Sequence, residues 1–183
     1  MFYWPIDGEV RLRLWERHDA PALAALVRDQ VEHLGRWLPF ATSAYTDAEA
    51  LTYIDRTRRE WAIYGGLELA VTVAPAWNFV GSVGLHSLDR LNHKGEVGYW
   101  LSEPYQGRGI MIRAVAALVD TAFTTFALNR LEIRAQPDNA RSRAIPERLG
   151  FTEEAILRED IRHPDGYVDH VVYGLLRKDW GGR

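Results

Sequence analysis

Residues 104–111 have the types and spacing that suit the binding of a phosphate. They read Pro-Tyr-Gln-Gly-Arg-Gly-Ile-Met, with an arginine, Arg108, between two glycines. Glycines let the backbone turn its amide groups inward, and the first turn of a helix presents free amides and the positive end of the helix dipole. The same residues are equally compatible with a plain tight turn between a strand and a helix.

Competing motifs for phosphate binding or nucleophilic catalysis are not supported. The chain has no P-loop of the form GxxxxGKS or GxxxxGKT, and a dinucleotide GxGxxG motif would need glycine where Ile112 stands. Gly81-Ser82-Val83-Gly84 lacks the GxSxG spacing of a hydrolase nucleophile elbow. The absence of cysteine excludes disulfides, thiolate metal sites and a cysteine nucleophile.

A group of acids and histidines near the C-terminus resembles a set of metal ligands. It comprises His163, Asp165, Asp169 and His170. Pro164-Asp165-Gly166 within it predicts a hairpin turn, however, and we favour the turn and expect no metal.

Hydrophobic periodicity indicates the elements on the N-terminal side of the glycine segment. Alternating residues predict strands at residues 10–14, 67–74, 77–88 and 94–101. Helical spacing predicts a helix capped by Asp19 and ending near Gly35. A second helix is expected from the capping box that Thr46 forms with Glu49 to about Tyr64.

On the C-terminal side, one helical face of apolar residues predicts a long amphipathic helix packed on the sheet. This face comprises Met111, Val115, Leu118, Ala122 and Phe126. A strand at residues 131–135, a short helix from about Asn139 to Gly150, a strand through Ile161 and a strand at residues 168–176 follow. The short connections between the central strands imply an antiparallel meander, and the order of elements is mixed α+β (mixed α/β).

Bulk properties favour one globular domain over residues 1–183. Nearly half of the residues are apolar, 47%, and 26% are charged, which is typical of a folded domain. A net charge of −3 gives no overall attraction to nucleic acid. The first residues do not resemble a signal peptide and no apolar run is long enough for a membrane span, so we expect a cytoplasmic protein without membrane partners.

Five motifs in the same order resemble the GNAT superfamily of N-acetyltransferases, and in particular its Rim-type branch, the ribosomal-protein N-terminal acetyltransferases. The pyrophosphate loop of that superfamily, Q-x-x-G-x-G/A, is matched at Gln106 and Gly109, with Met111 at the last, normally small, position. The other motifs are residues 98–101, 129–134, 139–142 and 147–151. The resemblance covers the chain from about Val10 to Trp180. It implies the GNAT fold, a splayed, mostly antiparallel mixed sheet of about seven strands flanked by about four helices.

The resemblance also implies a site for acetyl-CoA as the acyl donor, without a metal. In the family a bulge splays the strand that here carries Tyr99, Trp100 and Leu101, and its backbone pairs with pantetheine. The pyrophosphate would bind the amides of residues 107–111, that is Gly107, Arg108, Gly109, Ile110 and Met111, after Gln106. Asn139 would contact the pantetheine arm, and Arg108 and Arg143 the phosphates. Arg141, Arg143 and Arg148 are equally compatible with a solvated helix face.

The implied reaction is direct attack of an amine on the thioester, which needs a base for the ammonium and an acid for the thiolate. Many members carry a tyrosine acid at the position of Pro146, so the resemblance offers Ser142 or a water instead. Glu96 is the first choice of base, because it lies just before the splayed strand. His86 on the preceding strand and Glu159 on a late strand are the alternatives.

Several points stay open at this level. The acceptor is a primary amine, either a protein N-terminus or a small metabolite such as a polyamine or an aminoglycoside. A succinyl-CoA-using variant is an alternative. A second alternative is a non-catalytic, CoA-binding domain, because Pro146 stands at the position of the usual acid. A homodimer is expected from the resemblance.

Overall fold

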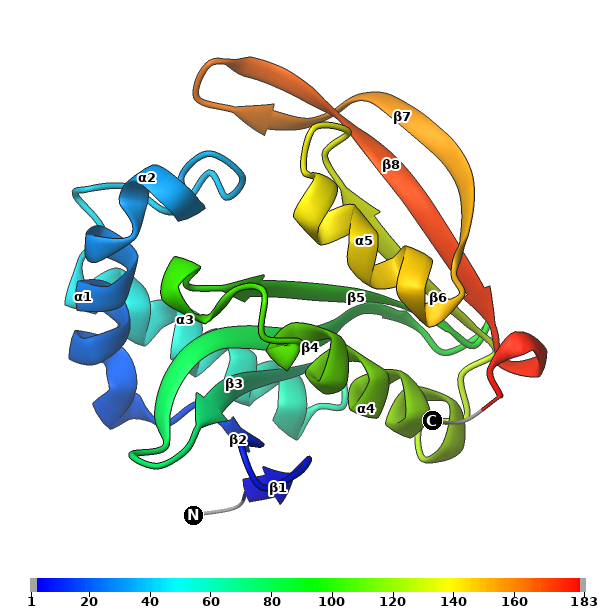
Figure 1. Ribbon diagram of the computed structural model, residues 1–183, viewed down its shortest axis with the longest axis horizontal. Coiled ribbons are helices and arrows are strands. Elements are labelled where there is room, and N and C mark those ends of the chain that lie inside the picture. Colours follow the sequence, from blue (N-terminus) through cyan, green and yellow to red (C-terminus); the bar gives the residue numbers. More distant parts are fainter. Residues whose placement is uncertain (1–2, 182–183) are drawn as a thin grey trace.

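The computed structural model describes residues 3–181, which form one open sheet with helices on both of its faces (Figure 1). The strands are β1 Tyr3–Pro5, β2 Val10–Leu14, β3 Leu67–Val73, β4 Asn78–Asp89, β5 Lys94–Leu101, β6 Arg130–Ala135, β7 Thr152–His163 and β8 Gly166–Leu176. The α-helices are α1 Ala20–Asp29, α2 Val31–Leu34, α3 Asp47–Ala62, α4 Ile110–Thr124 and α5 Ala140–Leu149. Three 3₁₀ turns occupy Arg17–Asp19, Glu103–Tyr105 and Arg177–Asp179.

The sheet has the order β1-β2-β3-β4-β5-β6-β8-β7, and only the pair β5 and β6 is parallel. The expected antiparallel meander of β3, β4 and β5 is confirmed. The mixed α+β class is confirmed as well, although the sheet has eight strands where about seven were expected. Sequence patterning missed β1, because three residues that include Pro5 are too short to show alternation.

Two apolar cores lie on opposite faces of the sheet. The larger core packs α4 against the inward residues of β2 to β6 and of β8, with Leu118 and Leu131 fully buried. The smaller core packs α1 and α3 around Trp15, with Ala70 as its residue from β3. Burial of a Leu or Val side chain contributes about 1.5–3 kcal/mol, so both helical layers are held to the sheet mainly by this term.

The boundaries of the first helices show where sequence patterning was right and wrong. The capping box is confirmed, with the Thr46 amide donating to the Glu49 carboxylate at 2.8 Å at the start of α3. Asp19 stands at the expected N-cap position of α1, with Pro21 in the first turn, but its side chain makes no capping hydrogen bond. The Asp19 carboxylate accepts from the Glu16 amide at 2.9 Å and pairs with Arg13, so it is not available to cap α1. The helix expected to reach Gly35 is interrupted at Gln30.

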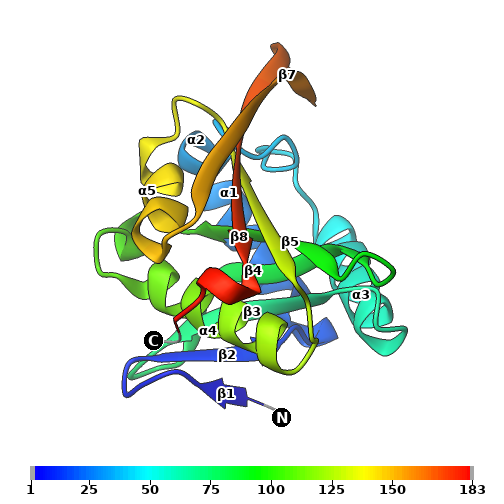
Figure 2. The ribbon, with the colours of Figure 1, turned by 90° about the vertical axis from the view of Figure 1, so that its right-hand side faces the viewer.

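The C-terminal strands β7 and β8 form a long curved hairpin that rises above the rest of the sheet (Figure 2). His163 pairs with Gly166 across a two-residue turn, so the expected turn at Pro164 and Asp165 is confirmed. Within residues 3–181 no group of three or more acids or histidines is arranged to hold a metal ion. In the same range no helix has the length and apolar character needed to cross a bilayer.

Candidate active site

The glycine segment enters α4 with its amide groups free. Gly107 and Gly109 adopt φ values of +73° and +70°, in the left-handed region that favours glycine. Gly109 is the N-cap of α4, and no side chain caps this end. Between residues 107 and 112 no backbone amide donates to another group of the described chain. Ile110 and Met111 are buried, which anchors the first turn in the core, so these amides are held in the arrangement in which helix N-termini bind anions.

The parallel strands β5 and β6 separate after a short contact. They pair only from Lys94 with Arg130 to Glu96 with Glu132. Beyond this point β6 follows β8, while β5 stays paired with β4 through Leu101. The expected splay is therefore confirmed, and it leaves one edge of β5 without a strand partner over residues 97–101. The bulge expected in the strand that carries Tyr99, Trp100 and Leu101 is not found over residues 96–101, where the register with β4 is continuous; the irregularity of this pair lies between His86 and Asp89 of β4.

Side chains of β5 alternate between the two sides of this opening. Val97, Tyr99 and Leu101 face the core that contains α4. Trp100 packs against the other core, with α1 and α3. Because successive side chains of a strand point to opposite faces, Glu96 and Gly98 lie on the same face as Trp100. Each side chain of β5 therefore faces either the α4 side of the opening or the side of α1 and α3.

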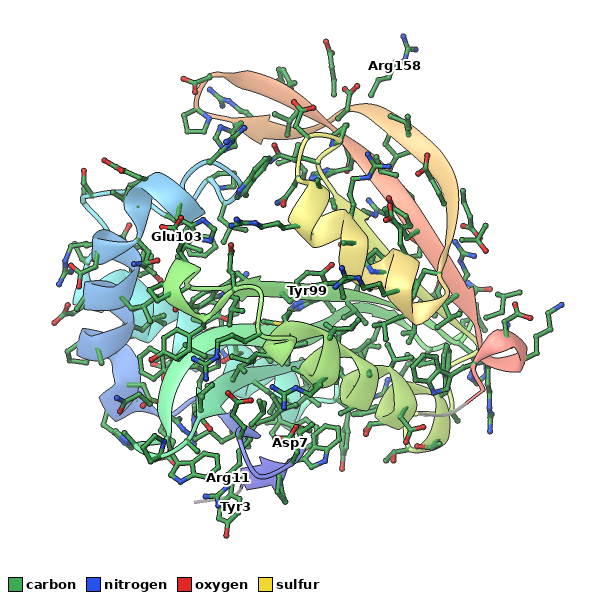
Figure 3. All side chains as sticks on the ribbon, viewed as in Figure 1. Tyr3, Asp7, Arg11, Tyr99, Glu103 and Arg158 are labelled. Atoms are coloured by element: carbon green, nitrogen blue, oxygen red, sulfur yellow. The ribbon has the colours of Figure 1, made fainter. Side chains whose placement is uncertain are left out.

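Tyr99 and Ser142 meet on the α4 side. The Tyr99 hydroxyl donates to the Ser142 carbonyl oxygen at 2.9 Å, and the Ser142 hydroxyl lies 3.4 Å from the Tyr99 oxygen. Figure 3 shows the Tyr99 side chain between β5 and α5. Burial raises the pKa of Tyr99, so its hydroxyl stays protonated and donates. Asn139 caps α5 by accepting from the Ser142 amide at 3.1 Å, which fixes the backbone at this position.

Glu96 and His86 lie together on the opposite face, as direct partners in the register of β4 and β5. His86 Nε2 lies 2.9 Å from Oε2 of Glu68, a buried carboxylate on β3. Burial tends to lower the pKa of His86, but the hydrogen bond and charge of Glu68, together with the charge of Glu96, outweigh it and leave the pKa above its ordinary value.

Arg134 joins Glu96 to the C-terminal hairpin. Its guanidinium lies 3.7 Å from Glu96, 3.3 Å from Glu132 and 3.7 Å from Asp160. Asp160 also lies 2.9 Å from Nδ1 of His170. Acidic groups from β5, β6 and β7 therefore gather on one face beside the point where β5 and β6 part.

Glu159 lies in an irregular stretch of β7. The register with β8 shifts between Leu157 and Ile161, Glu159 has a φ of +53°, and its amide donates to Asp169 at 2.8 Å. Its side chain is exposed, as is that of the adjacent Arg158, which projects from the hairpin in Figure 3. In this stretch Asp160 is the acid linked to Glu96, because both carboxylates contact Arg134.

The polar side chains around the glycine segment have partners within the protein. Arg108 lies 2.5 Å from Glu9, and Arg113 joins the same carboxylate. Arg143 donates to the Tyr173 hydroxyl at 2.8 Å and to the Pro137 carbonyl at 3.1 Å. Gln106 contacts His33 at 2.8 Å and accepts from Arg141, the arginine of α5 that reaches the glycine segment.

Sequence reasoning passed over several residues that the structure places at the site. Glu68 carries a signal that could have found it, because it is the one charged residue in the apolar strand β3. Arg134 and Asp160 carry no such signal, since alternating charged residues are ordinary on exposed strand faces. Only the strand order reveals that they meet.

A helix entrance with free amides, next to a parting of two parallel strands, is the arrangement expected in proteins that bind an extended, phosphorylated cosubstrate. The family model described as an acetyltransferase (GNAT) domain matches residues 9–152. The chain belongs to this family.

Individual relatives agree with the family match. YdaF of Bacillus subtilis (strain 168), named as a candidate ribosomal N-acetyltransferase, is 36% identical over 100% of this chain and 99% of its own length. A crystal structure described as that of an acetyltransferase superimposes with a TM-score of 0.91 at 36% identity, covering 98% of this chain and 99% of that chain. The fold is also that of RimL, a ribosomal L7/L12 α-N-protein acetyltransferase in complex with coenzyme A, with a TM-score of 0.90, 21% identity and coverage of 97% and 99%.

The protein is therefore an acetyl-CoA-dependent N-acyltransferase of the GNAT family, with Rim-type relatives. Acetyl-CoA is its cosubstrate, and the free amides of residues 107–112 fit the diphosphate of this molecule. The alternatives of a non-catalytic CoA-binding domain and of a succinyl-CoA-using variant are not favoured, because the relatives across the full length are named acetyltransferases.

Proposed function

We propose that the acceptor is the amine of a ribosomal protein, and specifically an N-terminal amine. The observation that carries the proposal is the 36% identity over the whole chain with YdaF, named as a candidate ribosomal N-acetyltransferase. The charges of the site support it. Glu68, Glu96 and Asp160 lie on the face of the sheet away from α4, and carboxylates favour the approach of an ammonium group.

We infer the following roles for the coenzyme residues. The amides of residues 107–111 bind the diphosphate, with Gln106 and Arg108 at the edge of this loop, and the free edge of β5 at Tyr99, Trp100 and Leu101 pairs with pantetheine. Asn139 and Arg143 on α5 complete the proposed coenzyme contacts. Arg108 and Arg143 reach the phosphates only by leaving their carboxylate partners Glu9 and Glu153.

The two faces of β5 suit the two proton transfers of the reaction. On the α4 side, Ser142 beside Tyr99 is the proposed acid for the departing thiolate. On the opposite side, the base that takes the proton of the ammonium is Glu96 or His86, with Glu159 as the more distant candidate. A base and an acid on opposite sides of the thioester can act in one ternary complex without a covalent enzyme intermediate.

The acceptor is tested by incubating the purified protein with labelled acetyl-CoA and a mixture of unacetylated ribosomal proteins, beside a panel of polyamines and aminoglycosides. We expect label on one or a few ribosomal proteins, located at the N-terminal residue by intact-protein and peptide mass spectrometry. Transfer to small amines alone would contradict the proposed acceptor while leaving the enzyme class intact. The Gly109→Trp variant, which we expect not to bind coenzyme A, serves as the negative control.

The base is tested with Glu96→Gln and His86→Asn measured side by side. Removal of the residue that acts as the base should lower kcat/KM for the amine by about a hundredfold or more. Removal of the other residue should cost less, and the affinity for coenzyme A should be unchanged in both variants.

A ribosomal acceptor is consistent with a cytoplasmic location, and we propose a homodimer from the resemblance to the GNAT superfamily. Cell fractionation tests the location, and sedimentation equilibrium of the full chain tests the dimer.

A further inference from the structure

Glu68 is a charged residue in a strand whose seven residues are all buried. Its carboxylate accepts from the Ser82 hydroxyl and lies 2.9 Å from Nε2 of His86. Ser82 is itself fully buried and receives the indole N–H of Trp15 at 3.3 Å. Burial of a carboxylate is costly unless it is paired and hydrogen-bonded, so the fold holds Glu68 in one orientation, towards His86.

Two glycines make the room that His86 occupies. A Cβ atom added at Gly84 would lie 2.7 Å from Nε2 of His86, and one added at Gly98 would lie 3.2 Å from the same atom. Gly98 comes two residues after Glu96, the last residue of β5 that pairs with β6. The Nε2–Cδ2 edge of the imidazole therefore lies over β5 where the opening begins, on the face opposite Tyr99, and Nδ1 lies on the other edge of the ring.

The two ring nitrogens of His86 differ in their surroundings. Nε2 lies 2.9 Å from Oε2 of Glu68, and no other carboxylate of residues 3–181 lies within 4.0 Å of the ring nitrogens. The His86 side chain is 46% exposed, and with Arg56, Glu60 and Glu68 it lines a hollow of about 180 Å³. A carboxylate that accepts from one ring nitrogen sets the tautomer and leaves the other nitrogen basic.

We propose that Glu68 is a positioning residue that accepts Nε2–H of His86 and thereby presents Nδ1 as the base for the acceptor ammonium. This inference rests on the proposed function and selects His86 from the two candidate bases. In the step, an ammonium N–H bond breaks and the Nδ1–H bond forms through one water. The freed lone pair of the amine attacks the thioester carbonyl, the C–S bond breaks, and the coenzyme A thiolate leaves with a proton from the Ser142 side, which the second N–H proton of the attacking nitrogen replaces. The imidazolium then returns its proton to water through the hollow.

Other charged groups also face the imidazole. Glu96 lies opposite on β5 with Arg134 of β6 beside it, Arg56 projects from α3, and the Tyr53 hydroxyl of α3 contacts Ser82 near Glu68. Burial, and next the charge of Glu68, raise the pKa of Tyr53, so it remains neutral beside the carboxylate. Burial lowers the pKa of His86, but the hydrogen bond to Glu68 is the largest of the contributions that raise it, and the net effect is upward.

The pH dependence of kcat/KM for the amine tests the proposal. The activity rises with pH as His86 loses its proton, so its pKa sets the acidic limb. Glu68→Gln removes the negative charge, which lowers the pKa of His86, and we expect the limb to move to lower pH while the maximum falls about tenfold or more. Glu68→Asp keeps the charge and should return the limb towards its wild-type position.

Glu60→Gln is the matched control. Glu60 lines the same hollow, and the same chemical change is made there without loss of a contact to His86. We expect this variant to keep the wild-type acidic limb and the wild-type maximum of kcat/KM. An unshifted limb in Glu68→Gln, or an equal shift in Glu60→Gln, would overturn the proposal.

A second measurement keeps the proposal testable if Glu68→Gln does not fold. The measurement is an NMR spectrum of the imidazole nitrogens in the ¹⁵N-labelled wild-type protein. The His86 signals are assigned by comparison with His86→Asn, and we expect the proton of the neutral ring on Nε2. A neutral ring with the proton on Nδ1 would overturn the proposal. A wild-type protein that acetylates ribosomal proteins while failing either measurement leaves the proposed function standing, whereas transfer to no amine at all overturns both.

Discussion

The Tyr99 hydroxyl donates to the Ser142 carbonyl oxygen at 2.9 Å, although the two residues lie 43 positions apart in the chain. In a regular helix this carbonyl would accept from the amide four residues later. That residue is Pro146, which lies inside α5 and has no amide proton. Pro146, at the position of the usual tyrosine of the family, therefore leaves the Ser142 carbonyl without its helical amide donor. The hydroxyl of Tyr99 from β5 replaces that donor.

The first prediction concerns this substitute bond. Tyr99→Phe should lower the free energy of unfolding by about 1–2 kcal/mol, because it leaves the part-buried Ser142 carbonyl without a donor. In a Pro146→Ala background the new amide can donate to this carbonyl, so the same change should cost about 1 kcal/mol less. Urea unfolding of the four proteins of this cycle measures the coupling, and a coupling near zero would contradict the exchange of donors.

The second prediction separates the two hydroxyl groups in catalysis. If Ser142 is the acid for the thiolate, Ser142→Ala should lower kcat by about tenfold or more, with little change in the affinity for coenzyme A. Tyr99→Phe should lower kcat less, since it keeps the Ser142 hydroxyl. Steady-state kinetics at saturating amine, with coenzyme A binding measured by calorimetry, provide the comparison. The reverse order of effects would move the role of the acid to Tyr99.

The third prediction concerns the anion site. Gly109→Trp places an indole where the free amides converge, so we expect loss of detectable coenzyme A binding. An L residue in the left-handed region also costs about 1–2 kcal/mol of stability. Gly150→Trp is the matched control. Gly150 lies at the C-terminal end of α5, away from the glycine segment in the chain, and has a φ of +84° with open space around it. The control should lose similar stability and keep its affinity. Unchanged affinity in Gly109→Trp would count against the site.

The fourth prediction concerns stability and pH at the Arg13–Asp19 pair. The two side chains are nearly fully buried and joined by bonds of 2.6 and 2.8 Å. Burial tends to raise the pKa of Asp19, but hydrogen bonds from Arg13 and from the Glu16 amide, with the charge of Arg13, leave it below its ordinary value of 3.8. A carboxyl with a lowered pKa stabilises the fold above that value and loses this contribution as pH falls through the folded-state pKa.

Asp19→Asn should therefore cost about 3–5 kcal/mol at neutral pH, because it leaves a buried guanidinium without its counter-charge. Below about pH 4 the wild type should weaken towards the variant, whose own stability changes less with acid. Urea midpoints between neutral pH and pH 3 measure both effects. A constant difference between the two proteins over this range would show that Asp19 does not titrate with folding.

Local patterns were sufficient to predict most elements of this protein. Alternation located the central strands, the capping box located the start of α3, and the glycine segment located the entrance of α4. These predictions succeed because strand periodicity, capping and helix entry depend on residues within a few positions of one another. β1 was missed because three residues that include Pro5 are too short to show alternation, and the cap at Asp19 failed because the pairing with the buried Arg13 outweighs the local preference.

The partnerships of the site were decided only by the tertiary structure. Glu68 with His86, Glu96 with Arg134, and Tyr99 with Ser142 each join residues from different strands or helices. Such pairs depend on strand order, on register and on which face of a strand a residue occupies, and a shift of one residue would place each side chain on the other face. The amino-acid sequence by itself predicted an anion site ahead of α4, and the packing of the sheet decided which acids, histidine and hydroxyls lie on the two sides of β5.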